Sequence, residues 1–426
     1  MFDIKFLREN PVLVKENIKK KFKNDRLKLV DEVLEKDKKW REIKGGVDSL
    51  RADRNKISKS IADAKKAGKD VKKILKEASL IPDKIESSEK KMYLLEGEIL
   101  EILSKIPNMM HESVPIGKND SENVEMRKIG KPEKFDFEIK NHAEIAEKLN
   151  VADFDSSAKT SGNGFYYIQG DLALLNQALI RFTIDKLVSK GFTYVETPLM
   201  LRGNVINNVT DLNDMKNQIY KMDGEDLYLI GTSEHSLIGR FIDTILQDAI
   251  LPIKSASYSM CFRKEVGSHG LDEKGLFRTH QFNKVEMAVI CRPSESMKFF
   301  EELKSITVEI FKELDVPIRV LSICSGDLGD LKHIQVDIEA WSPRKKAYFE
   351  VGSCSNLTDA QARRLKIRID PGKGEKYVPH TLNNTAIATS RAMVAILENN
   401  QQKDGSVKVP DVLVKYMYGK KFIGKK

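Results

Sequence analysis

The chain has 426 residues, of which 41% are hydrophobic and 32% are charged. Because an ordinary domain has ~100–200 residues, this length predicts two or three folding units, and the composition excludes disordered and collagen-like proteins. The sequence has no apolar stretch of the ~18–20 residues that a membrane span needs, nor a signal peptide at its start. Its four cysteines fit neither a disulfide framework nor a zinc ribbon, so we expect a cytoplasmic protein.

The net charge of +9 is concentrated near the N-terminus. Residues 15–105 hold 26 Lys and Arg against 18 Asp and Glu, which is +8 of the total. A basic surface of this kind favours a polyanionic partner through phosphate contacts and counterion release. The charge alone is equally compatible with a solvated helical face.

The same N-terminal region carries two heptad patterns. Apolar residues recur every seven positions between Val33 and Ala64, and again between Ile74 and Ile106. The short connection at residues 67–70 predicts an antiparallel helical hairpin. Its first helix, expected over residues 27–64, has a length on the order of 55 Å at ~1.5 Å per residue. Three interruptions of the pattern predict local kinks or fraying, namely Gly45-Gly46, Arg54 and Pro82.

Beyond Ile106 the pattern changes to proline, glycine and polar residues as far as about Gly164, which predicts a domain boundary. A helix is expected over residues 172–190 and a strand at residues 193–198, closed by Pro198. Further strands are expected at residues 227–230, 257–262, 283–291, 334–341 and 346–351. Several of these strands follow one another directly. We therefore expect an α+β fold, with an antiparallel sheet flanked by helices rather than a doubly wound parallel sheet.

The chemistry-bearing residues lie in this second part. The sequence contains neither of the common glycine-rich nucleotide cradles. It does contain two strand-like segments, at residues 261–265 and 277–286, on either side of a glycine-containing loop at 266–275. Alternation along a strand would place Arg263 and Glu265 on one face, where the arginine could bind a phosphate or carboxylate. Taken alone, these segments are also compatible with a hairpin that carries salt bridges.

Three motifs that follow one another along the chain indicate a more specific function. The helix and strand ending at Pro198, the segment from Arg263 to Phe282, and Asn383-Asn384-Thr385-Ala386 with Arg391 resemble motifs 1, 2 and 3 of class II aminoacyl-tRNA synthetases. Residues 231–234, residues 349–356, the opening Leu7-Arg8-Glu9-Asn10-Pro11 and the helical arm are similar to the seryl-tRNA synthetase family in particular. The resemblance implies a tRNA-binding domain with a helical arm at 1–106, a linker that begins the catalytic body at 107–164, and a class II catalytic domain at 165–426.

The resemblance also implies an activity and a nucleotide site. Members of this family join serine to ATP as seryl-adenylate and then transfer the acyl group to serine tRNA. Arg263 matches the catalytic arginine that bridges the serine carboxylate and the α-phosphate, while Arg391, also catalytic, and Arg278 match arginines that hold the γ-phosphate. The other nucleotide-site residues that the resemblance implies are Glu265 and Phe282 at adenine, with Thr279, Val351 and Gly352. Glu350 and Ser353 match the Mg²⁺ ligands.

For the amino acid, the resemblance implies an ammonium site and a hydroxyl site. Thr232, Ser233 and Glu234 belong to the first, whereas Glu286, Asn383 and Thr385 surround the hydroxyl. A site that pairs a buried hydroxyl rejects an analogue that lacks it. Ser233 replaces a small apolar residue that is more usual in the family, and Asn384-Thr385 replaces Gly-Ser. The sequence therefore does not define the detailed shape of the serine pocket.

The implied partners are serine tRNA, with selenocysteine tRNA as an open second candidate, L-serine and a second copy of the chain. Two alternatives are a class II paralogue that activates an amino acid for a carrier other than tRNA, and a coiled-coil scaffold that binds nucleic acid. A paralogue would be expected to lose the arm or a motif arginine. A scaffold would leave the three motifs without a role.

Overall fold

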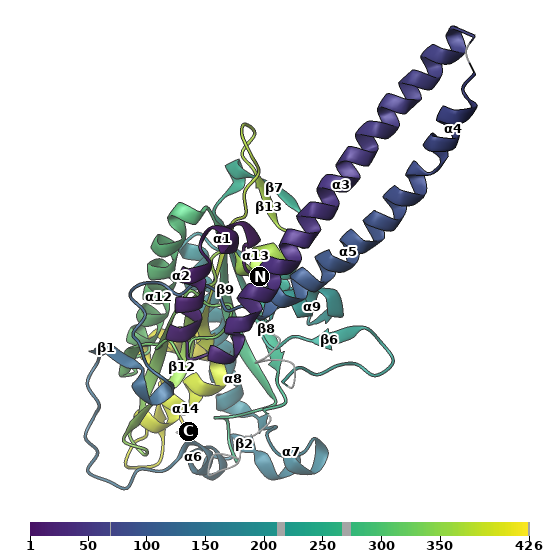
Figure 1. The fold of residues 1–426 in the computed structure, drawn as a ribbon. Coiled ribbons are helices and arrows are strands. Elements are labelled where there is room, and N and C mark those ends of the chain that lie inside the picture. Colours follow the sequence, from purple (N-terminus) through teal and green to yellow (C-terminus); the bar gives the residue numbers. More distant parts are fainter. Residues whose placement is uncertain (69, 211–217, 266–273, 425–426) are drawn as a thin grey trace. The chain divides into compact units, whose positions relative to one another are not determined.

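The computed structural model describes residues 1–68, 70–210, 218–265 and 274–424 (Figure 1). Lys69 of the predicted hairpin connection and residues 266–273 of the predicted motif 2 loop lie outside this part of the chain. The structure divides into two compact units, Met1–Pro107 and Asn108–Lys426. Residues 107–164, expected to be a linker and the start of the catalytic body, all belong to the second unit except Pro107.

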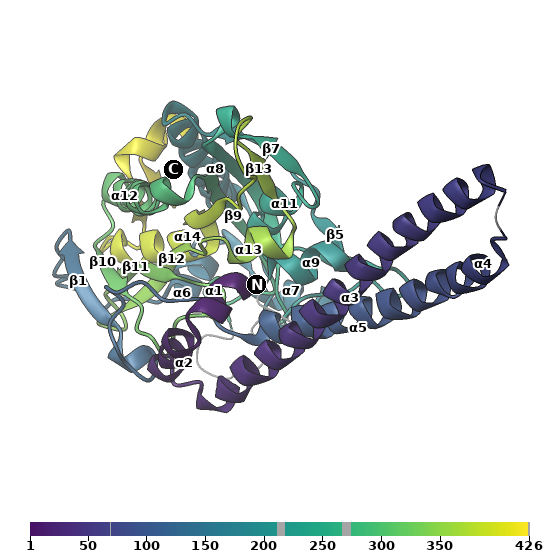
Figure 2. The same ribbon diagram turned by 45° about the horizontal axis from the view of Figure 1, so that its top comes forward.

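The first unit is helical. Its elements are α1 (Ile4–Glu9), α2 (Pro11–Lys20), η1 (Asn24–Arg26), α3 (Leu27–Lys66), α4 (Lys72–Ser79) and α5 (Ile81–Lys105). In both ribbon views α3 lies beside α4 and α5 (Figures 1 and 2). The ion pairs Lys36–Glu98 and Arg51–Glu89, each 2.6 Å, show that α3 and α5 run antiparallel. The predicted hairpin is therefore present.

The seam between these helices is formed by the heptad residues. Val47 is buried against Ile81 and Ile85, and Ile43 packs beside them. Helix α3 continues through Gly45-Gly46, so the glycine pair does not end the helix. Glycine costs a helix ~1 kcal/mol, and the packing of Ile43 and Val47 on either side of the pair holds the backbone in helical form. Pro82 does interrupt the second helix, because it lies in the first turn of α5, just after α4 ends.

The second unit is built on an eight-stranded sheet. Its strand order is β1 (Val124–Ile129), β10 (Ile318–Ser322), β11 (Ile334–Ser342), β12 (Ala347–Asn356), β14 (His380–Ala388), β9 (Gln281–Cys291), β8 (Ile253–Phe262) and β4 (Thr193–Tyr194). All neighbours are antiparallel except β4 and β8. The α+β expectation is confirmed. The strand predicted up to Pro198 is shorter, since β4 ends at Tyr194.

Helices and small sheets cover this large sheet. The helices are α6 (His142–Lys148), α7 (Phe154–Thr160), α8 (Gly170–Ser189), α9 (Gly203–Val209), α11 (Glu234–Gly239), α12 (Ser296–Glu313), α13 (Ala360–Arg364) and α14 (Thr389–Asn399). Paired short strands are β2 (Ala152–Asp153) with β3 (Tyr167–Ile168), β5 (Met200–Arg202) with β6 (Leu227–Leu229), β7 (Ile245–Gln247) with β13 (Arg368–Asp370), and β15 (Val407–Lys408) with β16 (Phe422–Ile423). Short 3₁₀ segments are η2 (Asp120–Glu122), η3 (Asp248–Ile250), η4 (Pro293–Glu295) and η5 (Asp411–Met417).

One apolar core joins the sheet to α8, α12 and α14. The Asn384 amide of β14 donates to Leu303 O and Thr307 Oγ1 of α12, at 2.6 and 2.9 Å. Because strand side chains alternate, Asn383 and Thr385 lie on the opposite face of β14. The four cysteines are buried free thiols. Within the described residues, no helix combines the length and the apolar character needed to cross a bilayer.

Candidate active site

A cleft of about 550 Å³, measured with the solvent at its mouth, opens where the β8–β9 hairpin meets β12 and the start of α14. It gathers residues that are up to 128 positions apart in sequence, from Arg263 to Arg391. Ten of the residues predicted from sequence line it, namely Arg263, Glu265, Arg278, Thr279, Phe282, Glu350, Val351, Gly352, Thr385 and Arg391. The antiparallel sheet therefore brings the second and third motifs to one place.

Arg263 is held in position from several sides. It follows the last residue of β8, and its backbone N–H donates to His280 O at 2.9 Å. Its Nε donates to Gly231 O at 3.2 Å, and its guanidinium carbon lies 5.4 Å from the centre of the Phe282 ring. These contacts use the Nε side of the guanidinium fork and restrain the direction of the remaining N–H groups.

Glu265 and Arg278 face each other across the mouth of the hairpin, with Arg278 Nε 3.9 Å from Glu265 Oε2. The expectation that Arg263 and Glu265 share one face of a strand is wrong, because β8 ends at Phe262 and Glu265 has φ +46°. A left-handed residue breaks the two-residue alternation. Both side chains nevertheless line the cleft.

Arg391 and Glu350 form the opposite wall. The Arg391 guanidinium donates through Nη1 to the carbonyl oxygen of Glu350 at 2.9 Å and to its Oε2 at 3.1 Å. Desolvation by the surrounding protein raises the pKa of the Glu350 carboxyl, but the positive charges of Arg391, Arg263 and Lys332 together outweigh this effect and hold that pKa below its usual value. Glu350 is therefore ionised at neutral pH.

Further oxygen atoms, those of Ser353 and Asp337, lie near Glu350. Ser353 of β12 is the register partner of Asp337 of β11. The amide of Gln335 donates to both, at 2.9 Å to Ser353 Oγ and 2.7 Å to Asp337 Oδ1. Burial and the negative charge of Glu350 raise the pKa of Asp337. Among the described residues no group of three or more His, Cys, Asp or Glu is arranged to hold a metal ion. The oxygen atoms gathered here are those of the Glu350 and Asp337 carboxyl groups and of the Ser353 hydroxyl.

A second polar cluster lies directly behind the cleft, around the buried Glu286 of β9. Lys284 Nζ is 2.5 Å from Glu286 Oε2, and the hydroxyls of Thr232 and Thr385 donate to the same oxygen at 3.1 and 3.5 Å. Lys284 and Thr385 also line the cleft. The carboxylate cluster and the arginine-lined cleft are thus continuous through these two side chains.

Glu234 lies at the start of α11, and its backbone N–H donates to Thr232 Oγ1 at 3.3 Å. Gln361 donates to its Oε1 at 3.0 Å. Burial and the charge of Glu286 raise the pKa of Glu234 to about 7, although Gln361 and Lys284 act in the opposite direction. Glu234 and Glu286 thus belong to one cluster, in which Glu286 is paired with Lys284.

The remaining predicted residues differ in their surroundings. Ser233 is fully buried, and its hydroxyl donates to Ser257 O of β8 at 3.3 Å. Asn383 shares its face of β14 with Thr385, next to Ser355 of β12. Asn384, the unusual residue of the third motif, packs on α12 and lies on the other face.

Sequence reasoning missed several residues of these clusters, among them Phe277, Lys284, Asp337 and Gln361. Lys284 could have been found, because it alternates with Phe282 and Glu286 along β9. Asp337 and Gln361 lie in segments with no motif, and only the strand register and the packing of α13 bring them close.

Comparisons with known proteins agree with this geometry. A family model described as the tRNA synthetase class II core domain (G, H, P, S and T) matches residues 218–400, so the second unit contains a class II aminoacyl-tRNA synthetase core. The seryl-tRNA synthetase N-terminal domain matches residues 1–110. The serine–tRNA ligase of Methanoregula boonei is 47% identical over 99% of this chain and 100% of its own length. The chain belongs to the seryl-tRNA synthetase family.

Solved structures lead to the same family. The seryl-tRNA synthetase from Pyrococcus horikoshii complexed with ATP has a TM-score of 0.93 and 43% identity, and the match covers 99% of both chains. The cytoplasmic serine–tRNA ligase from Naegleria fowleri in complex with AMP has a TM-score of 0.88 and 34% identity, over 99% of this chain and 98% of that one. Nothing in these comparisons favours the carrier-protein paralogue or the coiled-coil scaffold.

Proposed function

We propose that this protein activates serine with ATP and transfers the seryl group to serine tRNA. The observation that carries this proposal is the continuity of the two clusters. An arginine-lined cleft can bind a polyphosphate, and it adjoins two carboxyl groups, Glu234 and Glu286, that can bind an ammonium group. The relatives that match nearly the whole chain are named for this activity, and one of them is a complex with ATP.

In the activation step, a serine carboxylate oxygen attacks the α-phosphorus, and the bond to the pyrophosphate oxygen breaks. We assign Arg263 to the α-phosphate and the serine carboxylate, where its charge stabilises the transition state. Arg278 and Arg391 hold the γ-phosphate, and Phe282 stacks on adenine while Glu265 accepts from the adenine amine. Thr279, Val351 and Gly352 line the same cleft.

Serine would lie in the carboxylate cluster. Thr232 and Glu234 take its ammonium group, while Glu286, Asn383 and Thr385 surround its hydroxyl. The Lys284 ammonium forms an ion pair of 2.5 Å with Glu286 Oε2, and the carboxylate of Glu286 can accept a further hydrogen bond from the substrate hydroxyl. Alanine, which has no hydroxyl, would leave Glu286 without its substrate donor, so serine is preferred. Ser233 supports the cluster through its bond to β8.

The residues beside Arg391 fit Mg²⁺. Glu350, Ser353 and Asp337 offer carboxylate and hydroxyl oxygens, which are the ligands that this ion prefers. Arg391 bonds to Oε2 of Glu350, which leaves Oε1 for a cation. A bound ion would neutralise charge on the phosphates, and Glu350 and Ser353 would hold it.

We further propose that the basic N-terminal unit binds serine tRNA. The assembled enzyme is proposed to be a homodimer located in the cytoplasm. Selenocysteine tRNA is a second substrate to be tested. The deciding experiment is serine-dependent exchange of labelled pyrophosphate into ATP, followed by charging of purified serine tRNA. Exchange that needs serine, and not alanine or threonine, supports the proposal, whereas exchange without charging indicates the paralogue. No exchange at all would refute the proposed activity.

A further inference from the structure

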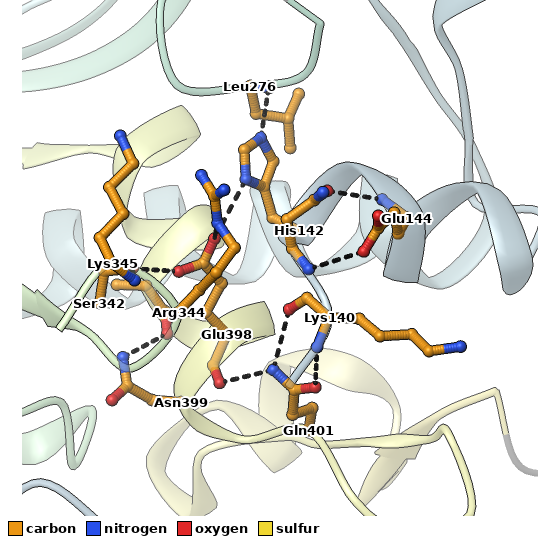
Figure 3. Close-up of polar contacts among 12 residues, drawn as sticks. Lys140, His142, Glu144, Leu276, Ser342, Arg344, Lys345, Glu398, Asn399 and Gln401 are labelled. Carbon is orange, nitrogen blue, oxygen red and sulfur yellow. Dashed lines mark hydrogen bonds and ion pairs between the residues drawn. The ribbon is translucent and has the colours of Figure 1, made fainter. Parts of the chain in front are cut away.

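A buried polar cluster joins α6, α14 and the chain segment that enters the nucleotide cleft (Figure 3). His142 is the first residue of α6 and Glu398 lies near the end of α14, and they are only 3% and 1% exposed. His142 Nδ1 lies 3.4 Å from Glu398 Oε1. On the other side of the ring, His142 Nε2 accepts from the backbone N–H of Leu276 at 3.0 Å.

These contacts fix the tautomer of the imidazole. A backbone N–H can only donate, so Nε2 must carry the lone pair, and in the neutral ring the proton is on Nδ1, which faces Glu398. The Glu398 carboxylate is itself held, because Ser342 Oγ donates to its Oε2 at 2.5 Å and Arg344 Nε lies 3.8 Å from its Oε1. The ring therefore presents a fixed acceptor to Leu276.

The backbone passes very close to this ring. Gly275 has φ +127°, and a Cβ at this position would lie 2.3 Å from His142 Nε2. Only glycine adopts this conformation without strain and leaves room for the imidazole. His142 thus contacts two consecutive residues at the C-terminal side of the motif 2 loop.

Those residues lead directly into the cleft. Leu276 is fully buried in the core, and the Phe277 ring lies 5.3 Å from Phe349 with the Lys345 ammonium 4.4 Å from its centre. Phe277 and the next residue, Arg278, both line the nucleotide cleft. The chain is therefore anchored two residues before Arg278.

We propose that His142 is a positioning residue for the nucleotide, which acts by holding the backbone that carries Phe277 and Arg278. Helix α14 bears Arg391 at its start and Glu398 near its end. The cluster therefore holds the segment that carries Arg278 and the helix that carries Arg391 in a fixed position relative to each other. The inference rests on the ATP site proposed above. It also gives residues 108–164 a role in the site, because they supply His142.

Two substitutions separate the two sides of the ring. His142→Gln places an amide oxygen near the position of Nε2 and can still accept from Leu276, whereas His142→Asn places its amide near Nδ1 and can contact only Glu398. A matched control is Gln401→Ala. The Gln401 amide exchanges hydrogen bonds of 2.9 and 3.1 Å with the backbone of Lys140 and donates to Glu398 O at 3.0 Å, so its loss loosens the same two segments without touching the bond from Leu276 to His142.

The assay is pyrophosphate exchange with KM measured separately for ATP and serine, together with thermal unfolding. In His142→Asn we expect the KM for ATP to rise roughly 5- to 10-fold and the KM for serine to stay within about twofold, because one backbone hydrogen bond is lost from the nucleotide side. His142→Gln and Gln401→Ala should keep the wild-type KM for ATP, even where their thermal stability falls.

Equal changes in the two His142 variants, a parallel rise in the KM for serine, or the same shift in Gln401→Ala would overturn the proposal, because each indicates a general structural role. If His142→Asn does not fold, Gly275→Ala provides the second test. Its methyl group pushes the backbone away from the ring, so a folded Gly275→Ala protein with an unchanged KM for ATP would also overturn it. A wild-type protein without serine-dependent exchange would instead refute the proposed function.

Discussion

Replacing the partly buried Glu234 by glutamine should stabilise the protein at alkaline pH while it weakens serine binding. Burial and the charge of Glu286 raise the pKa of Glu234 from 4.5 to about 7. Below the unfolded pKa both states are protonated and the native state carries no ionisation penalty. As the pH rises towards 7, the unfolded carboxyl loses its proton while the native one keeps it, so the free energy of unfolding falls.

The size of this effect follows from the two pKa values. With ~1.4 kcal/mol for each pH unit between 4.5 and about 7, the wild type loses up to about 3 kcal/mol of stability through this group. Glu234→Gln has nearly the same shape and can still accept from Gln361, which donates to Oε1 at 3.0 Å. Since glutamine does not ionise, the variant should escape this loss.

Urea unfolding of both proteins at about pH 5.5 and about pH 8 measures the difference, and the advantage of Glu234→Gln should grow by about 2 kcal/mol between the two. Calorimetry should find that wild-type affinity for serine rises with pH until about 7, as the carboxylate forms, and that the variant binds more weakly with no such rise. An equal stability difference at both pH values would refute the assignment of a raised pKa. Wild-type serine affinity in the variant would refute the role at the ammonium group.

Three further predictions concern catalysis, assembly and RNA binding. Arg263→Ala should lower pyrophosphate exchange by a factor on the order of 10²–10³ in a folded protein, since one charge-assisted donor at the α-phosphate is worth ~3–4 kcal/mol, and exchange within a few-fold of wild type would contradict this. Light scattering at micromolar concentration should give twice the mass of the chain, whereas a single-chain mass alone would exclude the proposed homodimer. Replacing residues 36–100 with a short glycine linker should leave serine activation nearly intact, lower tRNA charging by orders of magnitude and make tRNA binding less dependent on salt. Full charging by this variant, or an unchanged salt dependence, would show that the basic surface is only solvated.

The sequence by itself determined the features that depend on near neighbours. The heptad spacing from Val33 to Ile106 defined two helices of matching period, and their short connection required them to pair as a hairpin. The strand-like runs predicted β8, β9, β11 and β12 to within a few residues. The resemblance of its three motifs to those of class II aminoacyl-tRNA synthetases implied ten residues that line one cleft. The helices and strands depend on residues that are close in the chain, where periodicity and steric preference act directly.

The tertiary structure alone decided which distant groups meet. The register of β11 against β12 places Asp337 opposite Ser353, and the position of α13 brings Gln361 to Glu234. Packing keeps α3 helical through Gly45-Gly46, and the end of β8 allows Glu265 its left-handed conformation. His142 and Leu276 are 134 residues apart and no spacing rule relates them. Such contacts depend on the sum of many weak interactions across the core, and that sum is not recorded in any local pattern.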